Sequence, residues 1–241
     1  MTTLCFGHVK EDISAEALTR LDGCSRLWKD DFPSRWGDIP DSFRGPLSKS
    51  VSLKTRGFVK GRNGVSFVAE WDEITSGVFR ESEQWIGATN RADVRIRHVE
   101  GASWLFITVG PFDGFRVASR VSRALFDVQG RISTYDIPYS VLKEILRDDS
   151  RAEKYMWWKG VETGVDGGLR GSLPRTGGAR ERFDNAGKPT FARFECTSLN
   201  KLISISCKHG SIGGTHLTES EGTRYFLTQI LPKVRAARAS P

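Results

Sequence analysis

The chain from Val51 to Trp71 reads VSLKTRGFVKGRNGVSFVAEW, and this stretch predicts a β-hairpin. Asn63-Gly64 at its centre is the dipeptide that best accepts the positive φ angles of a type I′ turn. Polar and apolar residues alternate on both sides, as they do in half-buried strands. With these two residues as the loop, Arg62 lies opposite Val65 and successive side chains point to opposite faces.

In this register one face of the hairpin combines basic and aromatic side chains. No acidic residue occurs between Asp41 and Glu70, whereas six basic residues do. Rings that stack on unpaired bases and cations that neutralise phosphates are what a single-strand or RNA platform needs. The alternative is structural, with Trp rings in the core and basic residues protecting a sheet edge. The predicted face carries Lys54, Arg56, Phe58, Lys60, Arg62, Phe67 and Trp71.

A second hairpin and a basic helix are predicted at 92–126. Glu100-Gly101 is the expected turn, which places Arg97 opposite Trp104 and Arg95 opposite Phe106. The helix that follows is amphipathic. Its expected apolar side holds Phe115, Ala118, Val121 and Leu125, and another side holds Arg116, Arg120 and Arg123.

A third hairpin with a helix after it is predicted at 190–231. Leu199-Asn200 is its expected loop, Thr218 and Glu221 form a capping box, and Pro232 is expected to kink the helix. The expected apolar face of the hairpin holds Phe194, Cys196, Ile203, Ile205 and Cys207.

Hairpin followed by helix thus occurs twice. The predicted fold class is α+β, with antiparallel hairpins and helices on one side, and the repeated order suggests two pseudo-duplicated units. Residue identity between the two copies is negligible, so the repeat is one of pattern only. Further helices are expected from Ser14 to about Trp28 and from Pro138 to Asp149.

Residues 164–188, GVDGGLRGSLPRTGGARERFDNAGK, hold seven glycines and five basic residues. We expect a linker between an N-terminal part (1–163) and a second hairpin–helix unit (189–241), within what is alternatively one continuous domain. A loop that contacts RNA or DNA through Arg170, Arg175 and Arg180 is the second interpretation. A nucleotide cradle is disfavoured, because no Lys-Ser/Thr pair follows the glycines at the start of a helix.

Composition favours a polyanionic partner. The net charge is +7 and the pI about 9.4. The first residues lack a signal-length apolar stretch and no run approaches 18 apolar residues, so we expect an intracellular protein, cytoplasmic or nuclear, with no membrane partner. The four cysteines are scattered, and Cys196, Cys207, His209 and His216 match no usual zinc spacing, so we expect neither metal nor cofactor.

These patterns together predict a non-enzymatic protein that binds RNA or DNA. One alternative is an assembly adaptor, viral or part of a larger complex, with Tyr155, Trp157 and Trp158 as its protein-binding patch. A third is a metal-dependent nuclease that uses Asp166, Glu195 and Lys208. The sequence leaves undecided whether the partner is a second copy of the chain, as in a homodimer. The expected nucleic-acid contacts are Lys54, Arg56, Phe58, Lys60, Arg62, Trp71, Arg95, Arg97, Trp104, Phe106, Arg116, Arg120, Arg123, Arg170, Arg175 and Arg180.

Overall fold

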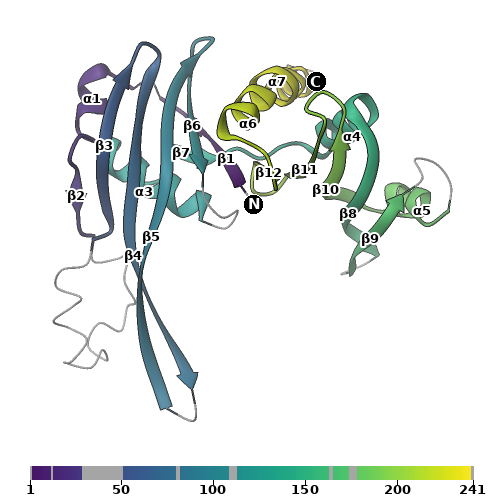
Figure 1. Cartoon of the computed structure of the whole chain (residues 1–241), viewed down its shortest axis with the longest axis horizontal. Coiled ribbons are helices and arrows are strands. Elements are labelled where there is room, and N and C mark those ends of the chain that lie inside the picture. The colour runs from purple at the N-terminus through teal and green to yellow at the C-terminus, as the bar shows by residue number, and fades with distance from the viewer. Residues whose placement is uncertain are drawn as a thin grey trace. The chain divides into compact units, whose positions relative to one another are not determined.

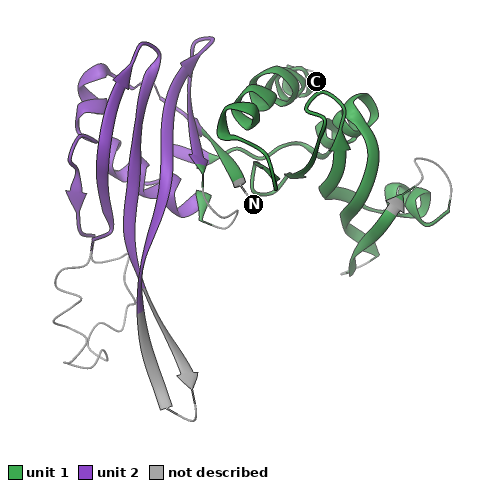
Figure 2. Ribbon diagram, viewed as in Figure 1, with its two compact units in different colours: residues 1–7, 108–114, 134–241 green, residues 8–107, 115–133 purple. Residues whose placement is uncertain are grey.

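The computed structural model has an α+β fold dominated by antiparallel β-structure. It describes residues 2–11, 13–28, 51–79, 82–108, 113–162, 165–173 and 178–239. The chain forms two compact units (Figure 2). Unit 1 comprises residues 1–7, 108–114 and 134–241, and unit 2 comprises residues 8–107 and 115–133. Among the described helices, none is long and apolar enough to cross a membrane.

Unit 2 is built on a sheet of strand order β2-β3-β4-β5-β6, with helix α3 covering one face (Figure 1). Strands β4 and β5 stay paired from Gly64–Arg97 to Phe79–Ser82. The elements of this unit are α1 (Ala15–Thr19), β2 (Ser25–Arg26), β3 (Leu53–Gly61), β4 (Gly64–Phe79), β5 (Ser82–Val99), β6 (Ala102–Thr108) and α3 (Gly114–Phe126).

The first hairpin forms, but its predicted register is wrong. Gly61 pairs with Gly64, so Arg62 and Asn63 make the loop. Between Arg56 and Val59 the register shifts by a β-bulge, in which Gly57 adopts a φ of 61°. Because a bulge inserts one unpaired residue, it reverses the facing of everything before it.

The bulge therefore separates basic from aromatic side chains. Arg56 pairs with Val68 and Lys54 with Glu70, on the face opposite to Phe67 and Trp71. The face that holds Phe67 and Trp71 is the core of unit 2, where α3 packs through Val117, Val121 and Leu125. Phe115, expected in this core, is instead 63% exposed.

The second predicted turn is confirmed. Glu100 and Gly101 separate β5 from β6 and have φ angles of 49° and 78°. The N-terminal helix starts where predicted, with Ser14 accepting from the Ala17 backbone N–H at 3.0 Å, but it ends at Thr19. The chain then turns through Gly23, which has a φ of 61°, into β2.

Unit 1 has the strand order β1-β12-β11-β10-β8-β9. Leu4, Ile212, Ile205, Ala192 and Met156 form one row across five of these strands, and all five are buried. The strand β7 (Ile132–Thr134) crosses the division, with Ile132 and Ser133 in unit 2. The other elements are β1 (Thr2–Val9), α4 (Tyr139–Asp149), β8 (Ser150–Glu162), β9 (Val165–Leu173), α5 (Gly178–Ala186), β10 (Lys188–Cys196), β11 (Lys201–Ser206), β12 (Ser211–Gly214), α6 (Glu219–Tyr225), a π-helical turn (Phe226–Ile230) and α7 (Leu231–Ala239).

Helices pack on the face that carries this row, which we call the inner face. The Phe226 ring stacks on Phe6 with centroids 4.0 Å apart, and α4 and α5 contact β8 and β10. The capping box of Thr218 and Glu221 is confirmed. The helix widens into a π-helical turn that ends two residues before Pro232, because proline supplies no N–H and its ring clashes with the carbonyl four residues back.

Residues 164–188 do not form the expected linker. Val165–Leu173 is β9, which pairs with β8, and Gly178–Ala186 is α5. Gly167 of β9 allows the Phe183 ring of α5 to pack on this strand, since a Cβ at Gly167 would lie 2.5 Å from the ring. The structure does not confirm the pseudo-duplication.

Candidate nucleic-acid interface

The aromatic part of the site expected in unit 2 lies in the protein interior. Trp71 is 0% exposed, Trp104 2% and Phe106 1%. The expectation that these rings lie on an open face is wrong. Trp71 shares its face with the core of α3, and Trp104 and Phe106 belong to β6, where five consecutive residues are buried. Phe58 is half-buried beside the bulge.

Several of the predicted basic residues make internal contacts. Arg56 forms an ion pair with Glu70 at 2.7 Å, and Arg116 forms one with Glu73. Arg120 is buried, with its guanidinium 5.6 Å from the Trp71 ring centroid. Because it is buried, Arg120 cannot reach a phosphate backbone. The Arg123 guanidinium lies 4.8 Å from the Trp28 ring centroid.

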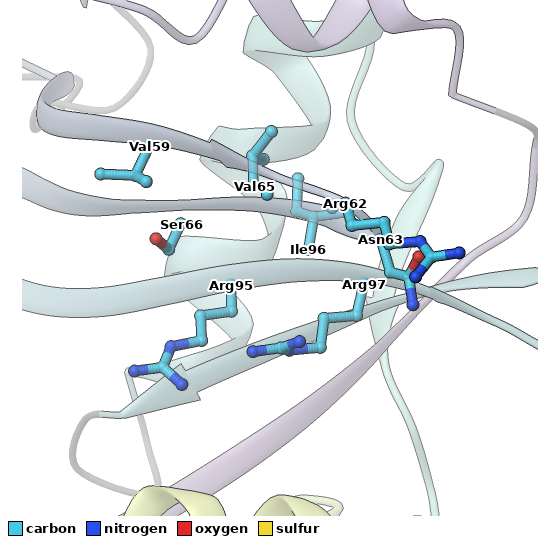
Figure 3. Close-up of a pocket in the computed structure, with 10 residues that line it drawn as sticks. Val59, Arg62, Asn63, Val65, Ser66, Arg95, Ile96 and Arg97 are labelled. Carbon is cyan, nitrogen blue, oxygen red and sulfur yellow. The ribbon is translucent and has the colours of Figure 1, made fainter.

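Other predicted cations remain on the surface of unit 2. Lys60, Arg62 and Arg97 are exposed, and Lys54 and Arg95 are half-buried. Arg62, Arg95 and Arg97 line a hollow of about 240 Å³ at the turn between β3 and β4 (Figure 3).

Unit 1 has an aromatic cluster on the face of its sheet opposite to the helices, which we call the outer face. Two neighbouring rows cross strands β9, β8 and β10 there. One row is Gly168–Trp157–Phe191, and the next is Arg170–Tyr155–Arg193. Trp157 is 39% exposed, and Tyr155 and Phe191 contact each other edge-to-face at 5.7 Å.

Gly168 gives the indole of Trp157 its position. A Cβ at Gly168 would lie 2.6 Å from the Trp157 ring and 3.2 Å from the Tyr155 hydroxyl oxygen. Only glycine leaves room for the indole to lie over β9, which keeps one surface of the ring in contact with the sheet. We define the aromatic face as Tyr155, Trp157 and Phe191.

Basic side chains surround the aromatic face. Arg170 and Arg193 flank Tyr155 in its row, and Lys159 follows Trp157 on the same side of β8. Lys159 also pairs in register with Lys188, and both are exposed. Like charges directly opposite each other on a sheet are destabilising, so an anion bound here would relieve the repulsion. Within the described residues, Lys159, Arg170 and Arg193 form no ion pair.

A groove of about 870 Å³ extends from this face. Trp157, Phe191 and Lys159 line it, together with Tyr139 at the start of α4 and Arg238 near the end of α7. Such a volume lies within the usual range for ligand sites. Burial first, and Lys208 second, lower the pKa of His209 in its wall, so its imidazole is neutral at pH 7.

The predicted contacts Arg170 and Arg180 lie in different surroundings. Arg170 lies beside the aromatic face, whereas Arg180 is buried and pairs with Glu153 and Asp184. Arg175 lies outside the described residues. Trp158 of the expected adaptor patch is buried, and its indole N–H donates to Asp184 at 2.8 Å.

Sequence reasoning noted Tyr155 and Trp157 but missed Phe191, Lys159 and Arg193 as their partners. The alternation of Tyr155, Trp157 and Lys159 along β8 was a usable signal. The pairing of β8 with β10 had none, because no short turn of defined type joins these two strands.

The nuclease residues do not form one cluster. Asp166 and Lys208 line the groove, and Asp166 accepts from the Gly160 backbone N–H at 2.9 Å. Glu195 forms an ion pair with Lys154 at 3.0 Å. Over the described ranges, no group of three His, Cys, Asp or Glu side chains is placed to hold a metal ion.

Comparisons with known proteins give no family. No protein-family model matches the chain, and no curated protein is significantly similar to it. A proposal of function therefore depends on the geometry alone.

Proposed function

We propose that this protein binds single-stranded nucleic acid on the aromatic face of unit 1, without catalysing a reaction on it. The supporting observation is that Tyr155, Trp157 and Phe191 occupy adjacent rows on the outer face of the sheet, with cations beside them. Bases stack on such rings whatever their sequence, and arginine and lysine neutralise the phosphates between them.

The surrounding charges favour a polymer over a protein partner. Lys159, Arg170 and Arg193 lie around the rings, and the groove beyond is lined by Lys208 and Arg238 and by two carboxylates, Asp136 and Asp166. A protein-binding patch is more often depleted of lysine at its centre. The adaptor alternative loses its Trp158, which is buried.

The test is fluorescence anisotropy with a labelled single-stranded oligothymidylate and oligouridylate. Trp157→Ala should weaken binding about tenfold, because stacking of one base on an aromatic ring contributes ~1–3 kcal/mol. Phe115→Ala, which removes an exposed ring from α3, is the matched control and should bind as the wild type does.

Two outcomes would contradict the proposal. One is a wild-type protein that binds neither oligonucleotide, and the other is a Trp157→Ala protein with unchanged affinity for both. Circular dichroism of each variant shows whether the fold is retained. We expect it to be retained in Trp157→Ala, because the side chain is exposed on the outer face.

A further inference from the structure

The hollow at the β3–β4 turn lies beside two paired glycines, Gly61 and Gly64. Two rows cross β3, β4 and β5 there, Gly61–Gly64–Arg97 and Val59–Ser66–Arg95. Two adjacent glycines in the first row leave the backbone bare beside Arg97. Gly64 cannot be replaced easily, because it has a φ of 150° and a Cβ there would lie 1.9 Å from the Ile96 carbonyl oxygen.

Three arginines border this bare backbone, two from β5 and one from the hairpin loop. Arg95 and Arg97 are two residues apart on β5, so their side chains extend in the same direction (Figure 3). Arg62 lines the hollow from the hairpin loop, and its guanidinium lies beside Asn63, away from those of Arg95 and Arg97 (Figure 3).

The lining of the hollow matches an oxyanion and not a base. No acidic and no aromatic side chain belongs to it within the described part of the chain. The other polar groups are the Asn63 amide and the Ser66 hydroxyl, which add hydrogen-bond donors. Guanidinium groups bind phosphate oxygens in a fork geometry, and a site without rings offers a base nothing to stack on.

We propose that Arg62, Arg95 and Arg97 bind backbone phosphates of the nucleic acid, independently of its bases. The inference rests on the proposed function for the identity of the polymer, but it concerns a different surface with a different chemistry. Unit 1 contacts bases by stacking, and the hollow in unit 2 contacts only phosphodiester groups.

Two probes separate the surfaces. One is a fluorescently labelled oligothymidylate, and the other is a strand of equal length made only of abasic deoxyribose phosphate. Binding of each is measured over a salt series for wild type, Trp157→Ala and the double variant Arg62→Ala/Arg97→Ala. Lys10→Ala/Arg91→Ala is the matched control, since it removes two exposed positive charges from the same unit outside the hollow.

The double variant should reduce the slope of log K against log salt by about 1.4 on both probes, because each phosphate contact on a single strand contributes about 0.7. The control should retain the wild-type slope. Trp157→Ala should weaken binding of the oligothymidylate and leave binding of the abasic strand unchanged.

Failure of either proposal is recognisable. Wild-type slopes in the double variant would overturn the phosphate site, whatever Trp157→Ala does. An unchanged Trp157→Ala with a reduced slope in the double variant would overturn base stacking and leave the phosphate site supported. Free inorganic phosphate is the other ligand with this chemistry. Its binding is tested by titrating phosphate while the Arg97 Nε–H resonance is followed by nuclear magnetic resonance. If free phosphate saturates the hollow while the double variant keeps its slopes, the hollow does not bind the polymer.

Discussion

The carboxylate of Asp149, at the end of α4, joins three elements of unit 1. It accepts hydrogen bonds from the Tyr225 hydroxyl at 2.8 Å, the Ser198 backbone N–H at 2.8 Å, the Ser198 hydroxyl at 2.7 Å and the Cys196 thiol at 3.1 Å. Burial alone would raise the pKa of Asp149, but hydrogen bonds from Ser198, Cys196 and Tyr225 lower it below its ordinary value. The residue therefore stays ionised although it is buried.

Asp149→Ala should lower the free energy of unfolding by about 2–3 kcal/mol at pH 7, because it leaves the buried Tyr225 hydroxyl and Cys196 thiol without an acceptor. Urea denaturation followed by tryptophan fluorescence measures this loss. A lowered pKa means that the contribution is complete above the ordinary aspartate pKa of about 4 and disappears as the pH falls below it. The difference between wild type and variant should shrink accordingly. Asp148→Ala, at the exposed neighbour, is the control, and an equal loss in both variants would contradict this account.

Trp157 and Trp158 show how one step along a strand changes the role of a residue. The indole of Trp158 is buried against Phe183, at 5.2 Å between centroids, and the indole of Trp157 is on the outer face. Alternation along a strand predicts that the two rings point to opposite faces. Which of them points outward depends on where the helices pack, and no residue near them encodes that.

At the scale of the element, α5 is attached to β8 by a buried cluster of charges. Arg180 forms ion pairs with Glu153, which is 2% exposed, and with Asp184 at 3.2 Å. Asp184 also accepts from Trp158. The segment expected to be a linker is thus held to the sheet by the arginine that was expected to contact nucleic acid.

Arg180→Ala should destabilise the protein by about 3–5 kcal/mol, because it leaves the Glu153 carboxylate buried without its partner. The double variant Arg180→Met/Glu153→Leu should recover most of this loss, since it removes both charges. Thermal unfolding of the two variants and the Glu153→Leu single variant gives the coupling between the residues. A double variant less stable than either single variant would show that the ion pair is not the cause.

The helix starts and the Glu100-Gly101 turn were predicted from the sequence, but the loops of the first and third hairpins and the strand registers were not. Ser14, Pro138 and the pair Thr218 and Glu221 mark helix starts because their signals act within four residues. The register of the first hairpin failed at two places, because the loop is Arg62-Asn63 and because Gly57 forms a bulge. A glycine in a strand has no sequence mark that distinguishes a bulge from a plain position.

At the scale of the whole molecule, burial makes all four cysteine thiols unreactive. Cys5, Cys24, Cys196 and Cys207 are free and buried. Burial, and to a lesser extent Asp113, raises the pKa of Cys5 to about 12, and burial with Asp136 does the same for Cys207. Their thiolate forms are negligible at neutral pH.

In the unfolded protein, each of the four cysteines should react with Ellman's reagent at pH 8 and release one coloured nitrothiobenzoate ion. The native protein should not react on the same time scale. The assay in native buffer and in guanidinium chloride measures this directly. Rapid reaction of even one thiol in the native state would show that the corresponding part of the core opens.

The amino-acid sequence by itself determined the α+β class, the turn at Glu100-Gly101, the capped helix starts and the basic charge, because each depends on neighbours along the chain or on composition. Only the tertiary structure decided that the rings of Trp71 and Trp104 lie in the core and that Trp157 and Phe191 meet on an outer face. Alternation assigns residues to two faces of a sheet, but contacts between segments distant in sequence decide which face the helices cover. The sequence predicted a sheet face with rings and cations in unit 2, whereas the structure has such a face in unit 1.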